Sequence, residues 1–336
     1  MTIFLNILFL VIGMVLLIKG ADFFVSGASA IAKKLKVPSI FIGLTIVALG
    51  TSLPELSVSV TSAISGSVDL SVGNIVGSNV FNMMLILGLV AIASPIKMAT
   101  TTQKIDLPFL FAVTGMLMLF GFDTWLDNSQ NNMLSRVESI LFLIILILYL
   151  FILISNAKKK RTHTITQEAQ QLASSEQVEQ TEKDLKIWQI ILYVTLGLAA
   201  VVFGGECVST TAKFLAIKMG MSEALVGLTI VAVGTSLPEL VTSVVAAKKK
   251  ENDLALGNVI GSNIMNITLI LGSVGAIAQA PISMVILTDI IILFAFTFIF
   301  TFFCVRKDNI SKREGIVLLS LYIAYIAFAI IRNYCF

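Results

Sequence analysis

Long apolar runs separated by short polar stretches make up most of this chain. The runs extend over about 20 residues or more without alternation of apolar and polar positions, so they predict membrane-spanning helices and not barrel strands. Ten such segments can be placed, at 3–30, 38–65, 71–94, 105–122, 135–155, 187–215, 223–247, 254–278, 283–305 and 313–333. The pattern predicts an all-α, polytopic membrane protein with ten transmembrane helices.

The composition supports insertion into a lipid bilayer. Hydrophobic residues make up 57% of the 336, charged residues only 13%, and the mean hydropathy is +0.96. The first residues, MTIFLNILFL, have no basic segment and no small-residue cleavage site, so they read as the start of the first helix and not as a removed signal peptide. Eighteen of the 23 Lys and Arg residues fall in loops that follow odd-numbered helices. Those loops are therefore expected to be cytoplasmic, with both termini outside.

A polar stretch at 156–186, rich in Gln, Ser and Glu, interrupts the apolar runs near the middle of the chain. It predicts a cytoplasmic linker between a first five-helix unit at 1–155 and a second at 187–336. The soluble segments are too small for a nucleotide domain, and no phosphate-binding GxxxxGK[ST] loop occurs, which disfavours an ATP-driven pump. The net charge of +3 follows from the loop lysines and gives no reason to propose nucleic acid as a partner.

The two units repeat one another at an offset of 184 residues. The stretch GLTIVALGTSLPELSVSV at 43–60 matches GLTIVAVGTSLPELVTSV at 227–244, and GNIVGSNVFN at 73–82 matches GNVIGSNIMN at 257–266. Because each unit has an odd number of helices, the second enters the membrane from the opposite side. The chain is thus predicted to contain two inverted five-helix repeats, an arrangement typical of secondary transporters with a substrate site near the midplane.

The repeated GTSLPEL motif places a proline and a carboxylate in mid-membrane. Pro54 and Pro238 are expected to break the second and seventh helices and to release backbone carbonyls, which lipid tolerates only where they line a cavity or find a partner. Glu55 and Glu239 follow, each at an insertion cost of about 2.5–3.5 kcal/mol. Neither motif offers a Lys or Arg as partner, so the carboxylates are expected either to be protonated or to bind a metal cation.

Further oxygen and amide groups accompany each glutamate. A hydroxyl pair lies three and four residues earlier, on the same face of a continuous helix: Thr51 and Ser52 in one unit, Thr235 and Ser236 in the other. The third and eighth helices carry stripes with a spacing of four: Asn74, Ser78 and Asn82, then Asn258, Ser262 and Asn266. The nearby glycine pairs 73/77 and 257/261 predict close helix packing, and the amide and hydroxyl stripes either bond between helices or face the site.

This donor set consists of two carboxylates, hydroxyls, amides and freed carbonyls. It contains no sulfur or imidazole ligand, and the three cysteines lack metal-type spacing. Hard cations that accept several flexible oxygens fit it, above all Ca²⁺ and in part Na⁺. Mg²⁺ retains its water too firmly, and Zn²⁺ or Cu⁺ would require nitrogen or sulfur.

With its paired GTSLPE and GNxxGSN motifs, the sequence resembles the cation/calcium exchanger superfamily, in particular the prokaryotic sodium/calcium exchangers, over nearly the whole chain except the linker. The resemblance implies a site held by helices two, three, seven and eight, and tilted helices one and six that slide across this core. It also implies a ligand set, with Glu55 and Glu239 as central ligands of Ca²⁺ and Na⁺ and Thr51 and Thr235 as Ca²⁺ ligands. The flanking Na⁺ sites would be lined by Ser52, Ser236 and the carbonyls of Ala48 and Ala232, and the middle of the site completed by Asn82, Ser78 and Ser262.

One position departs from part of that superfamily. Archaeal and potassium-dependent exchangers have Asp where this chain has Asn266, and the amide resembles the potassium-independent animal branch. Two carboxylates then remain, which one Ca²⁺ or several Na⁺ can neutralise. An empty site would carry two buried charges, and the cost of moving them favours obligatory exchange over leak. Three Na⁺ per Ca²⁺, as the resemblance implies, would move one net charge, worth about 2.3 kcal/mol per 100 mV.

The sequence predicts an Na⁺/Ca²⁺ antiporter of the plasma (inner) membrane, electrogenic and K⁺-independent. It is not expected to be an enzyme, to need a cofactor or to require an obligatory protein partner; its partners are the two ions and the lipid bilayer. The alternative is a Ca²⁺/H⁺ antiporter in which both glutamates titrate, although that branch resembles GNxxE around its acidic residue. A passive channel would favour a rotationally symmetric pore and needs no inverted duplication.

Overall fold

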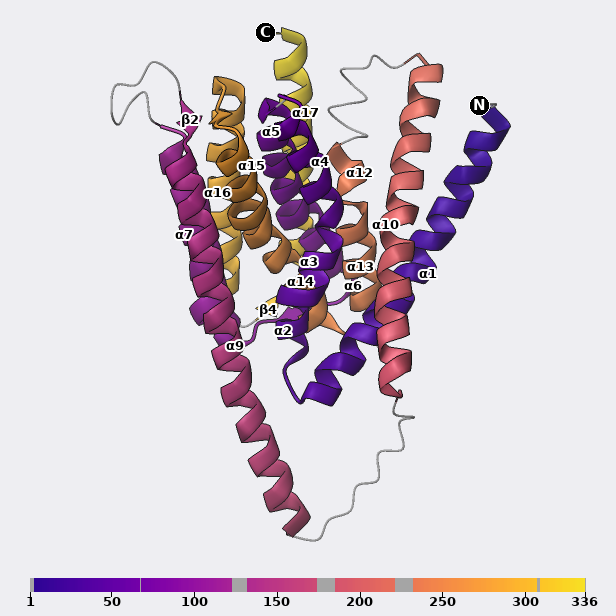
Figure 1. Ribbon diagram of the computed structural model, residues 1–336, viewed down its shortest axis with the longest axis vertical. Helices are drawn as coiled ribbons and strands as arrows, with labels where there is room; N and C mark the ends of the chain where they lie inside the picture. The colour runs from indigo at the N-terminus through magenta and orange to yellow at the C-terminus, as the bar shows by residue number, and fades with distance from the viewer. Residues whose placement is uncertain are drawn as a thin grey trace.

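The protein is a bundle of long helices, seen here in a computed structural model that describes residues 3–66, 68–122, 132–173, 185–220, 232–306 and 309–335 (Figure 1). Both chain ends lie at the upper end of the bundle in Figure 1, and the helices on either side of the linker, which end at Ala173 and begin at Ile187, have their linker-side ends at the lower end. We call these the terminal end and the linker end. Among the described residues, eight helices are long and apolar enough to cross a membrane, and a bent helix pair makes a ninth span.

Each half begins with one long helix, and its second and third spans are divided into shorter segments. In the first half the elements are α1 (Ile3–Leu35), α2 (Ser39–Ile42), the π-helical turn η1 (Gly43–Val47), α3 (Ala48–Thr51), α4 (Leu53–Ile64), α5 (Val68–Val80), η2 (Phe81–Ile86), α6 (Leu87–Ala93), β1 (Ile96–Lys97), η3 (Thr102–Asp106), α7 (Leu107–Phe120), β2 (Met133–Leu134) and α9 (Arg136–Ala173).

The second half repeats this order. Its elements are α10 (Ile187–Lys218), α12 (Ala232–Thr235), α13 (Leu237–Lys248), α14 (Asn252–Met265), η5 (Asn266–Leu271), α15 (Gly272–Ile277), β3 (Ala280–Pro281), α16 (Met284–Arg306), β4 (Asn309–Ile310) and α17 (Lys312–Cys335). The predicted all-α fold is confirmed. The start of the seventh predicted helix, at 223–231, lies outside the described residues.

One boundary differs from the prediction by more than a few residues. The fifth helix was expected to end at 155, but α9 continues to Ala173, into the stretch assigned to the linker. This segment, KKKRTHTITQEAQQLA at 158–173, has no apolar periodicity but contains no Gly or Pro. Extending an existing helix fixes one residue per added hydrogen bond, whereas a new helix must first pay for a nucleus. The spanning part of α9 therefore carries the helix beyond the membrane.

Matching contacts at opposite ends of the bundle express the inverted repeat. β1 pairs antiparallel with β4, and β2 with β3, so each two-stranded ladder joins one half to the other. The helices that follow β2 and β4 start with the same capping box, in which Ser135 and Ser311 donate their backbone N–H groups to Glu138 and Glu314 at 2.8 and 2.7 Å. The two halves thus use equivalent local structures.

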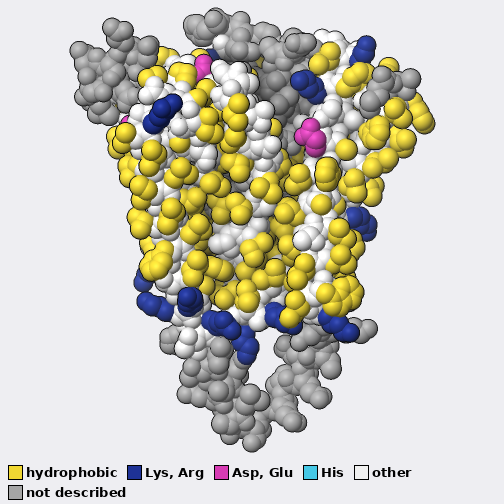
Figure 2. Space-filling view, viewed as in Figure 1, with side chains coloured by type: hydrophobic (Ala, Val, Ile, Leu, Met, Phe, Trp, Pro, Cys, Tyr) yellow, Lys and Arg dark blue, Asp and Glu magenta, His cyan; other side chains and the backbone are white. Residues whose placement is uncertain are grey.

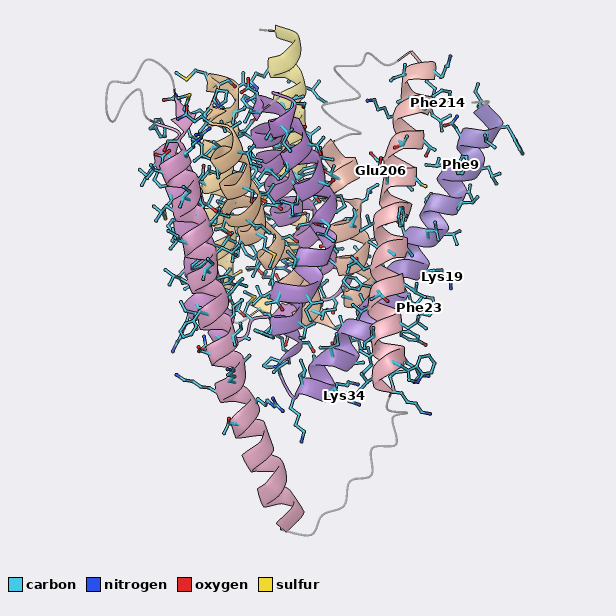
Figure 3. All side chains as sticks on the ribbon, viewed as in Figure 1. Phe9, Lys19, Phe23, Lys34, Glu206 and Phe214 are labelled. Carbon is cyan, nitrogen blue, oxygen red and sulfur yellow. The ribbon has the colours of Figure 1, made fainter. Side chains whose placement is uncertain are left out.

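Helices α1 and α10 cross with their backbones in direct contact. A Cβ added to Gly20 would lie 2.8 Å from the backbone N of Val201, and one added to Gly197 would lie 2.5 Å from that of Phe24. Such close approach requires glycine. Figure 3 shows the two helices side by side at the edge of the bundle, with Phe23 on α1 and Phe214 on α10 among the labelled side chains. The pair forms a long unit beside the rest of the protein.

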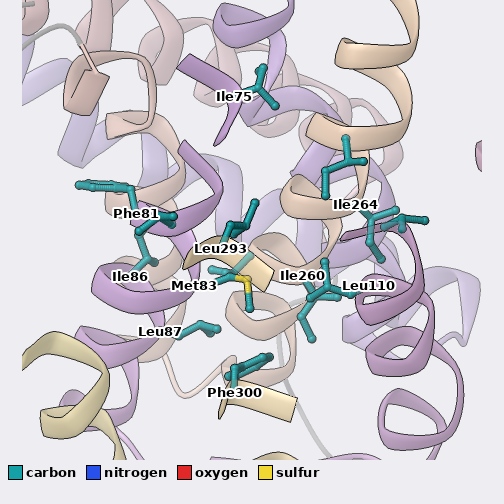
Figure 4. Packing of buried hydrophobic residues seen from close by; sticks show 14 of the residues in the cluster. Ile75, Phe81, Met83, Ile86, Leu87, Leu110, Ile260, Ile264, Leu293 and Phe300 are labelled. Carbon is teal, nitrogen blue, oxygen red and sulfur yellow. The ribbon is translucent and has the colours of Figure 1, made fainter. Parts of the chain in front are cut away.

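Apolar side chains fill the bundle and also cover its sides. The core includes Ile75, Met83, Leu87, Ile260 and Phe300, all at most 1% exposed and contributed by α5, η2, α6, α14 and α16 (Figure 4). On the face shown in Figure 2, hydrophobic side chains form a broad band, and Lys and Arg gather along its lower edge. This is the surface of a multi-pass membrane protein.

Candidate cation site

The site begins where two spanning helices break. The segment Ser39–Thr51 meets α4 at an angle of 46°, and the chain between them consists of Ser52 alone. Ser236 occupies the same position between α12 and α13, with φ −92° and ψ 6° against −83° and 5° at Ser52. Pro54 and Pro238 stand in the first turn of the new helices, where a missing N–H costs nothing. The predicted break is confirmed at both positions.

The breaks place both glutamates in the first turn of a helix. Glu55 lies in α4 and Glu239 in α13, and both side chains are 0% exposed. The N-terminal end of a helix carries a partial positive charge and unpaired N–H groups, which stabilise a nearby carboxylate. This stabilisation offsets only part of the cost of burying two negative charges. Hydroxyl groups stabilise the two carboxylates further.

Those hydroxyls are exchanged between the halves. Ser52 donates to Oε1 of Glu239 at 3.0 Å, and Ser236 donates to Oε1 of Glu55 at 3.1 Å. The sequence pattern placed each serine on the same face as the glutamate of its own motif. That expectation assumed a continuous helix, whereas the helix breaks at the serine and turns its hydroxyl toward the opposite half. Each carboxylate is therefore held by its own helix and by the other repeat.

A second layer of polar groups extends the network. The hydroxyls of Ser78 and Ser236 lie 2.8 Å apart, and the side-chain amide of Asn266 donates to Ser78 at 3.2 Å and to Oδ1 of Asn79 at 2.9 Å. Asn79 in turn donates to the backbone carbonyl of Asn263 at 3.3 Å. Asn79 and Asn263 were not among the predicted site residues, although the repeated GSN triplet contains both.

The threonines contact asparagines of the opposite half. Thr51 lies 3.1 Å from Oδ1 of Asn258, and Thr235 lies 3.4 Å from Oδ1 of Asn74. The carbonyl of Ala48 accepts the backbone N–H of Ser52 at 3.0 Å, which puts this predicted ligand carbonyl directly behind the helix break. Ala232 opens α12 at the equivalent position. The ligand roles of these groups remain predictions.

Several buried polar atoms in this region have no hydrogen-bond partner. Among the described residues they include the second carboxylate oxygen of each glutamate and side-chain atoms of three predicted ligands: Glu55 Oε2, Glu239 Oε2, Asn82 Oδ1 and Nδ2, Ser262 Oγ and Asn266 Oδ1. An unpaired buried polar atom costs about 1–3 kcal/mol, so a group of them requires an explanation. All but one of these atoms are oxygens, which can coordinate a cation. A bound hard cation would satisfy them.

Asn82 and Asn266 also share an unusual backbone. Asn82 lies in η2 and Asn266 opens η5, and both turns are π-helical. A π-turn inserts one residue into a helix and is frequent at functional sites. Asn82 and Ser262 are fully buried, but no hydrogen bond joins them to the serine–glutamate network among the described residues. The evidence that Asn82 and Ser262 belong to the site is therefore their buried side-chain atoms without hydrogen-bond partners.

The glycine pairs behave as packing residues where both partners are described. A Cβ on Gly257 would lie 2.6 Å from the carbonyl oxygen of Ile40, and one on Gly261 would lie 2.7 Å from that of Leu44. For the pair at 73 and 77, no described residue lies within 4 Å. The segment equivalent to 40–44 is 224–228, which lies outside the described residues. The expected packing is confirmed for the second pair.

The donor set narrows the chemistry. Among the residues that the structure describes, no three His, Cys, Asp or Glu side chains converge on one point, so the site has two carboxylates and otherwise neutral donors. Such a set binds hard cations with several oxygens and lacks the nitrogen and sulfur ligands of zinc or copper sites. Inverted repeats, broken helices and a buried oxygen-lined centre together define a membrane carrier for cations.

Sequence comparison gives the family. The family model described as sodium/calcium exchanger protein matches residues 5–155 and 189–331. Curated relatives include the putative antiporter CaxA of Alkalimonas amylolytica, 39% identical over 324 residues, with 95% of this chain and 96% of the relative covered. The sodium/calcium exchanger MaX1 of Methanosarcina acetivorans is 36% identical, with 96% and 97% covered. The chain belongs to the sodium/calcium exchanger family.

Solved structures agree with this assignment. The sodium–calcium exchanger NCX_Mj, in a structure soaked with Na⁺ and Sr²⁺, superimposes with a TM-score of 0.81 at 30% sequence identity. The match covers 97% of this chain and 99% of that one. The predicted fold of two inverted five-helix repeats is therefore confirmed, and the resemblance inferred from the motifs is correct.

Proposed function

We propose that this protein exchanges Na⁺ for Ca²⁺ across the plasma membrane by alternating access. The observation that carries the proposal is the serine-crossed glutamate pair, two buried carboxylates each bonded to the other repeat and each with one oxygen unpaired. Two negative charges suit one Ca²⁺ or a set of Na⁺ ions, so the ions compete for one centre. The names of MaX1 and NCX_Mj, both called sodium/calcium exchangers, support this reading.

The same pair explains obligatory exchange. An empty centre would carry two uncompensated carboxylates through a low-dielectric region, which is costly. Either ion set removes that cost, so loaded carriers cross and empty ones do not. With three Na⁺ per Ca²⁺ one net charge moves per cycle, and current should accompany transport. Asn266 in place of an aspartate supports independence from K⁺, because the described residues then contribute no third carboxylate to the centre.

Alternation is assigned to the α1–α10 pair. Its direct backbone contacts hold the two helices together as one body beside the core, as sliding requires. The Lys and Arg side chains gathered at the linker end support a cytoplasmic position for that end and an outside position for both termini. We assign Ca²⁺ ligation to the residues expected from the sequence, with the two glutamates central and Thr51, Thr235, Ser78 and Asn82 beside them.

The test is uptake of radiolabelled Ca²⁺ into proteoliposomes that contain the purified protein. Outward gradients of Na⁺ and of H⁺ are compared, each with and without K⁺, for wild type and for Glu55→Gln and Glu239→Gln. Uptake driven by Na⁺, independent of K⁺ and absent in both variants is the expected result. A transient inward or outward current on Ca²⁺ addition would report electrogenicity.

Other outcomes separate the alternatives. Uptake driven only by H⁺ would assign the protein to Ca²⁺/H⁺ antiport, in which the two glutamates carry protons. The name of CaxA specifies an antiporter without naming its ions, so this second candidate stays in the experiment. Ca²⁺ flux that depends on neither the Na⁺ nor the H⁺ gradient would contradict the carrier mechanism.

A further inference from the structure

Two asparagines of the repeated GNxxGSN motif stand one shell behind the proposed ligands. Asn258 is 1% exposed, and its Oδ1 lies 3.1 Å from the hydroxyl of Thr51. Its Nδ2 donates to the hydroxyl of Ser243 at 2.9 Å and to the backbone carbonyl of Glu239 at 3.5 Å. The two amide bonds orient the side chain, because Nδ2 must face Ser243 and Oδ1 must then face Thr51.

This orientation controls the threonine hydroxyl. The groups around it are acceptors: Asn258 Oδ1 and the carbonyls of Val47 and Ala48 lie within 3.4 Å, and the carboxylate of Glu239 is a further partner. A hydroxyl surrounded by acceptors gives its proton to one of them and retains both lone pairs for another partner. A cation is such a partner. An amide turned the other way would donate to the hydroxyl and occupy a lone pair.

The equivalent unit of the other half is open. Asn74 accepts from Thr235 at the longer distance of 3.4 Å, but its Nδ2 is buried without a partner. Ser59, which corresponds to Ser243 at the offset of 184, also has a buried hydroxyl without a partner. The threonine, asparagine and serine thus form a closed hydrogen-bonded unit around Asn258 and an open unit around Asn74, and in each unit the threonine comes from the opposite half.

The open and closed units differ in exposure. Thr51 and Asn258 are buried, whereas Thr235 and Asn74 are half-buried. The α2–α3 segment rises from the linker end, and α12 lies toward the terminal end (Figure 1). The closed unit therefore lies on the linker side of the centre, and we take this arrangement as the state that opens to the terminal side.

We propose that Asn258 and Asn74 are positioning residues for ion binding and that their amide–serine bonds alternate. In this state Asn258 bonds Ser243 and fixes Thr51; in the opposite state Asn74 bonds Ser59 and fixes Thr235. Inverted repeats exchange their arrangements when a carrier changes the side of access. Each state then has one closed and one open unit, so the penalty of the unpaired amide is the same in both. The proposal rests on the proposed exchange function.

The test measures Ca²⁺ half-saturation separately at each membrane face. Proteoliposomes of known protein orientation, read from proteolysis of the linker, are supplied with Ca²⁺ from the bath or from the lumen. Removing one hydrogen-bonding amide should weaken binding about five- to tenfold. Asn258→Ala should raise half-saturation at the terminal face and leave the linker face unchanged, and Asn74→Ala should do the reverse. Ser243→Ala and Ser59→Ala should follow their asparagines, and they remain usable if an asparagine variant fails to fold.

Two controls distinguish positioning from packing. Thr114→Ala removes another buried hydroxyl, which bonds within α7 at 2.8 Å, and should leave half-saturation unchanged at both faces. In a double-mutant cycle, Asn258→Ala should add nothing to the affinity loss of Thr51→Val, because the asparagine acts through the threonine. Equal changes at both faces, additive losses in the cycle, or a lower maximal rate with unchanged half-saturation would each overturn the proposal.

The wild-type arm keeps the two proposals apart. If wild type shows no Na⁺-driven uptake, the proposed function fails before any variant is compared. Equilibrium binding of Ca²⁺ to the purified protein then tests the positioning role, with weaker binding expected for Asn258→Ala than for Thr114→Ala. Equal binding by these two variants would contradict it.

Discussion

Helix α14 and helix α1 both belong to apolar membrane spans, yet they differ in which side chains they bury. Every residue from Leu254 to Met265 in α14 is buried, including Asn258, Ser262 and Asn263. In α1 most side chains face outward, and its buried positions include glycines and alanines that contact α10. Within the spanning region, α14 thus holds polar groups of the centre in the interior, while α1 turns apolar side chains outward, as a surface that faces lipid requires.

The difference separates ion binding from movement. The centre is held by directional hydrogen bonds that cross between the halves, which fix ligands to fractions of an ångström. The α1–α10 pair is held along its crossing by close packing, including the edge contact of the Phe23 and Tyr193 rings.

Apolar contacts such as those of Leu198 with Gly50 and of Gly205 with Pro238 join the α1–α10 pair to the core. The pair's polar ties to the core among the described residues include, at the linker end, the pairing of Lys249 with Asp22 at 2.8 Å and the bond of Ser29 to Glu251. A rigid ion centre and a movable α1–α10 pair can coexist because hydrogen bonds hold the centre, whereas mainly apolar packing holds the pair.

The largest effect on exchange is expected from a substitution that separates helices α1 and α10. In Gly197→Ala the new Cβ would meet the backbone of Phe24, which cannot yield, so the helices must separate. Exchange should fall more than about tenfold, while equilibrium Ca²⁺ binding changes less than about threefold, because the ligands lie in the core. Uptake and isothermal calorimetry measure the two quantities.

The matched control for this change is Gly115→Ala. There the new Cβ would meet only the ring of Phe294 at 3.2 Å, which can turn aside. A loss of Ca²⁺ binding in Gly197→Ala as large as its loss of exchange would show that the pair and the centre are not separate.

A smaller effect is expected from removing one crossing bond in the core. Ser52→Ala leaves Oε1 of Glu239 without its hydroxyl donor. A hydrogen bond to a charged group contributes about 1.5–3 kcal/mol, so Ca²⁺ affinity should fall about tenfold or more. Calorimetric titration measures this. Ser57→Ala, at an exposed position of the same helix, should match wild type, and equal losses in both would argue against the crossing bond.

The next prediction concerns stability without ion binding. Arg332 on α17 makes a bidentate ion pair with Asp289 on α16 at 3.0 and 2.9 Å, with both side chains mostly buried. Asp289→Asn should lower stability by about 2 kcal/mol, because the arginine loses its countercharge. The midpoint of thermal denaturation should fall, while Ca²⁺ affinity stays at the wild-type value. A changed affinity would connect these outer helices to the centre.

The smallest effect is expected at the ionic tie of α1. The side chains of Lys249 and Asp22 are 30% and 51% exposed, so their pairing is worth at most about 1 kcal/mol and weakens with salt. Lys249→Gln should change the exchange rate less than about fivefold, and the difference from wild type should shrink at high ionic strength. The exposed neighbour provides the control, Lys248→Gln. A salt-independent difference would contradict an electrostatic tie.

Much of the centre was predictable because its residues recur. Glu55 and Glu239, the helix breaks at the prolines and the stripe residues Ser78 and Asn266 all follow from two motifs that appear twice. The crossing of serines to the opposite glutamates was not predictable, since spacing describes neighbours within one helix and the contact is between halves. The same limit hid Asn79, whose partner is Asn266 of the other repeat.

Other features could not be predicted because they do not change the pattern of apolar and polar residues. The π-helical turns at 81–86 and 266–271 add a residue to a helix without changing its hydrophobicity. The glycines of α1 and α10 look like scattered small residues until the two helices are laid together. The extension of α9 to Ala173 depends on the stability of the helix before it, which local composition does not record.

The two short strand ladders carry a consequence for the origin of the chain. Each ladder takes one strand from each half, and the close contacts of Gly88 with Gly315 and of Gly272 with Ser139 also join halves. Two copies of a single half, inserted in opposite orientations, would offer one another all of these partners. The architecture is that of a twofold antiparallel dimer fused into one polypeptide. Covalent connection of the halves in one chain keeps together two units that, as separate polypeptides, would have to meet by diffusion in the membrane.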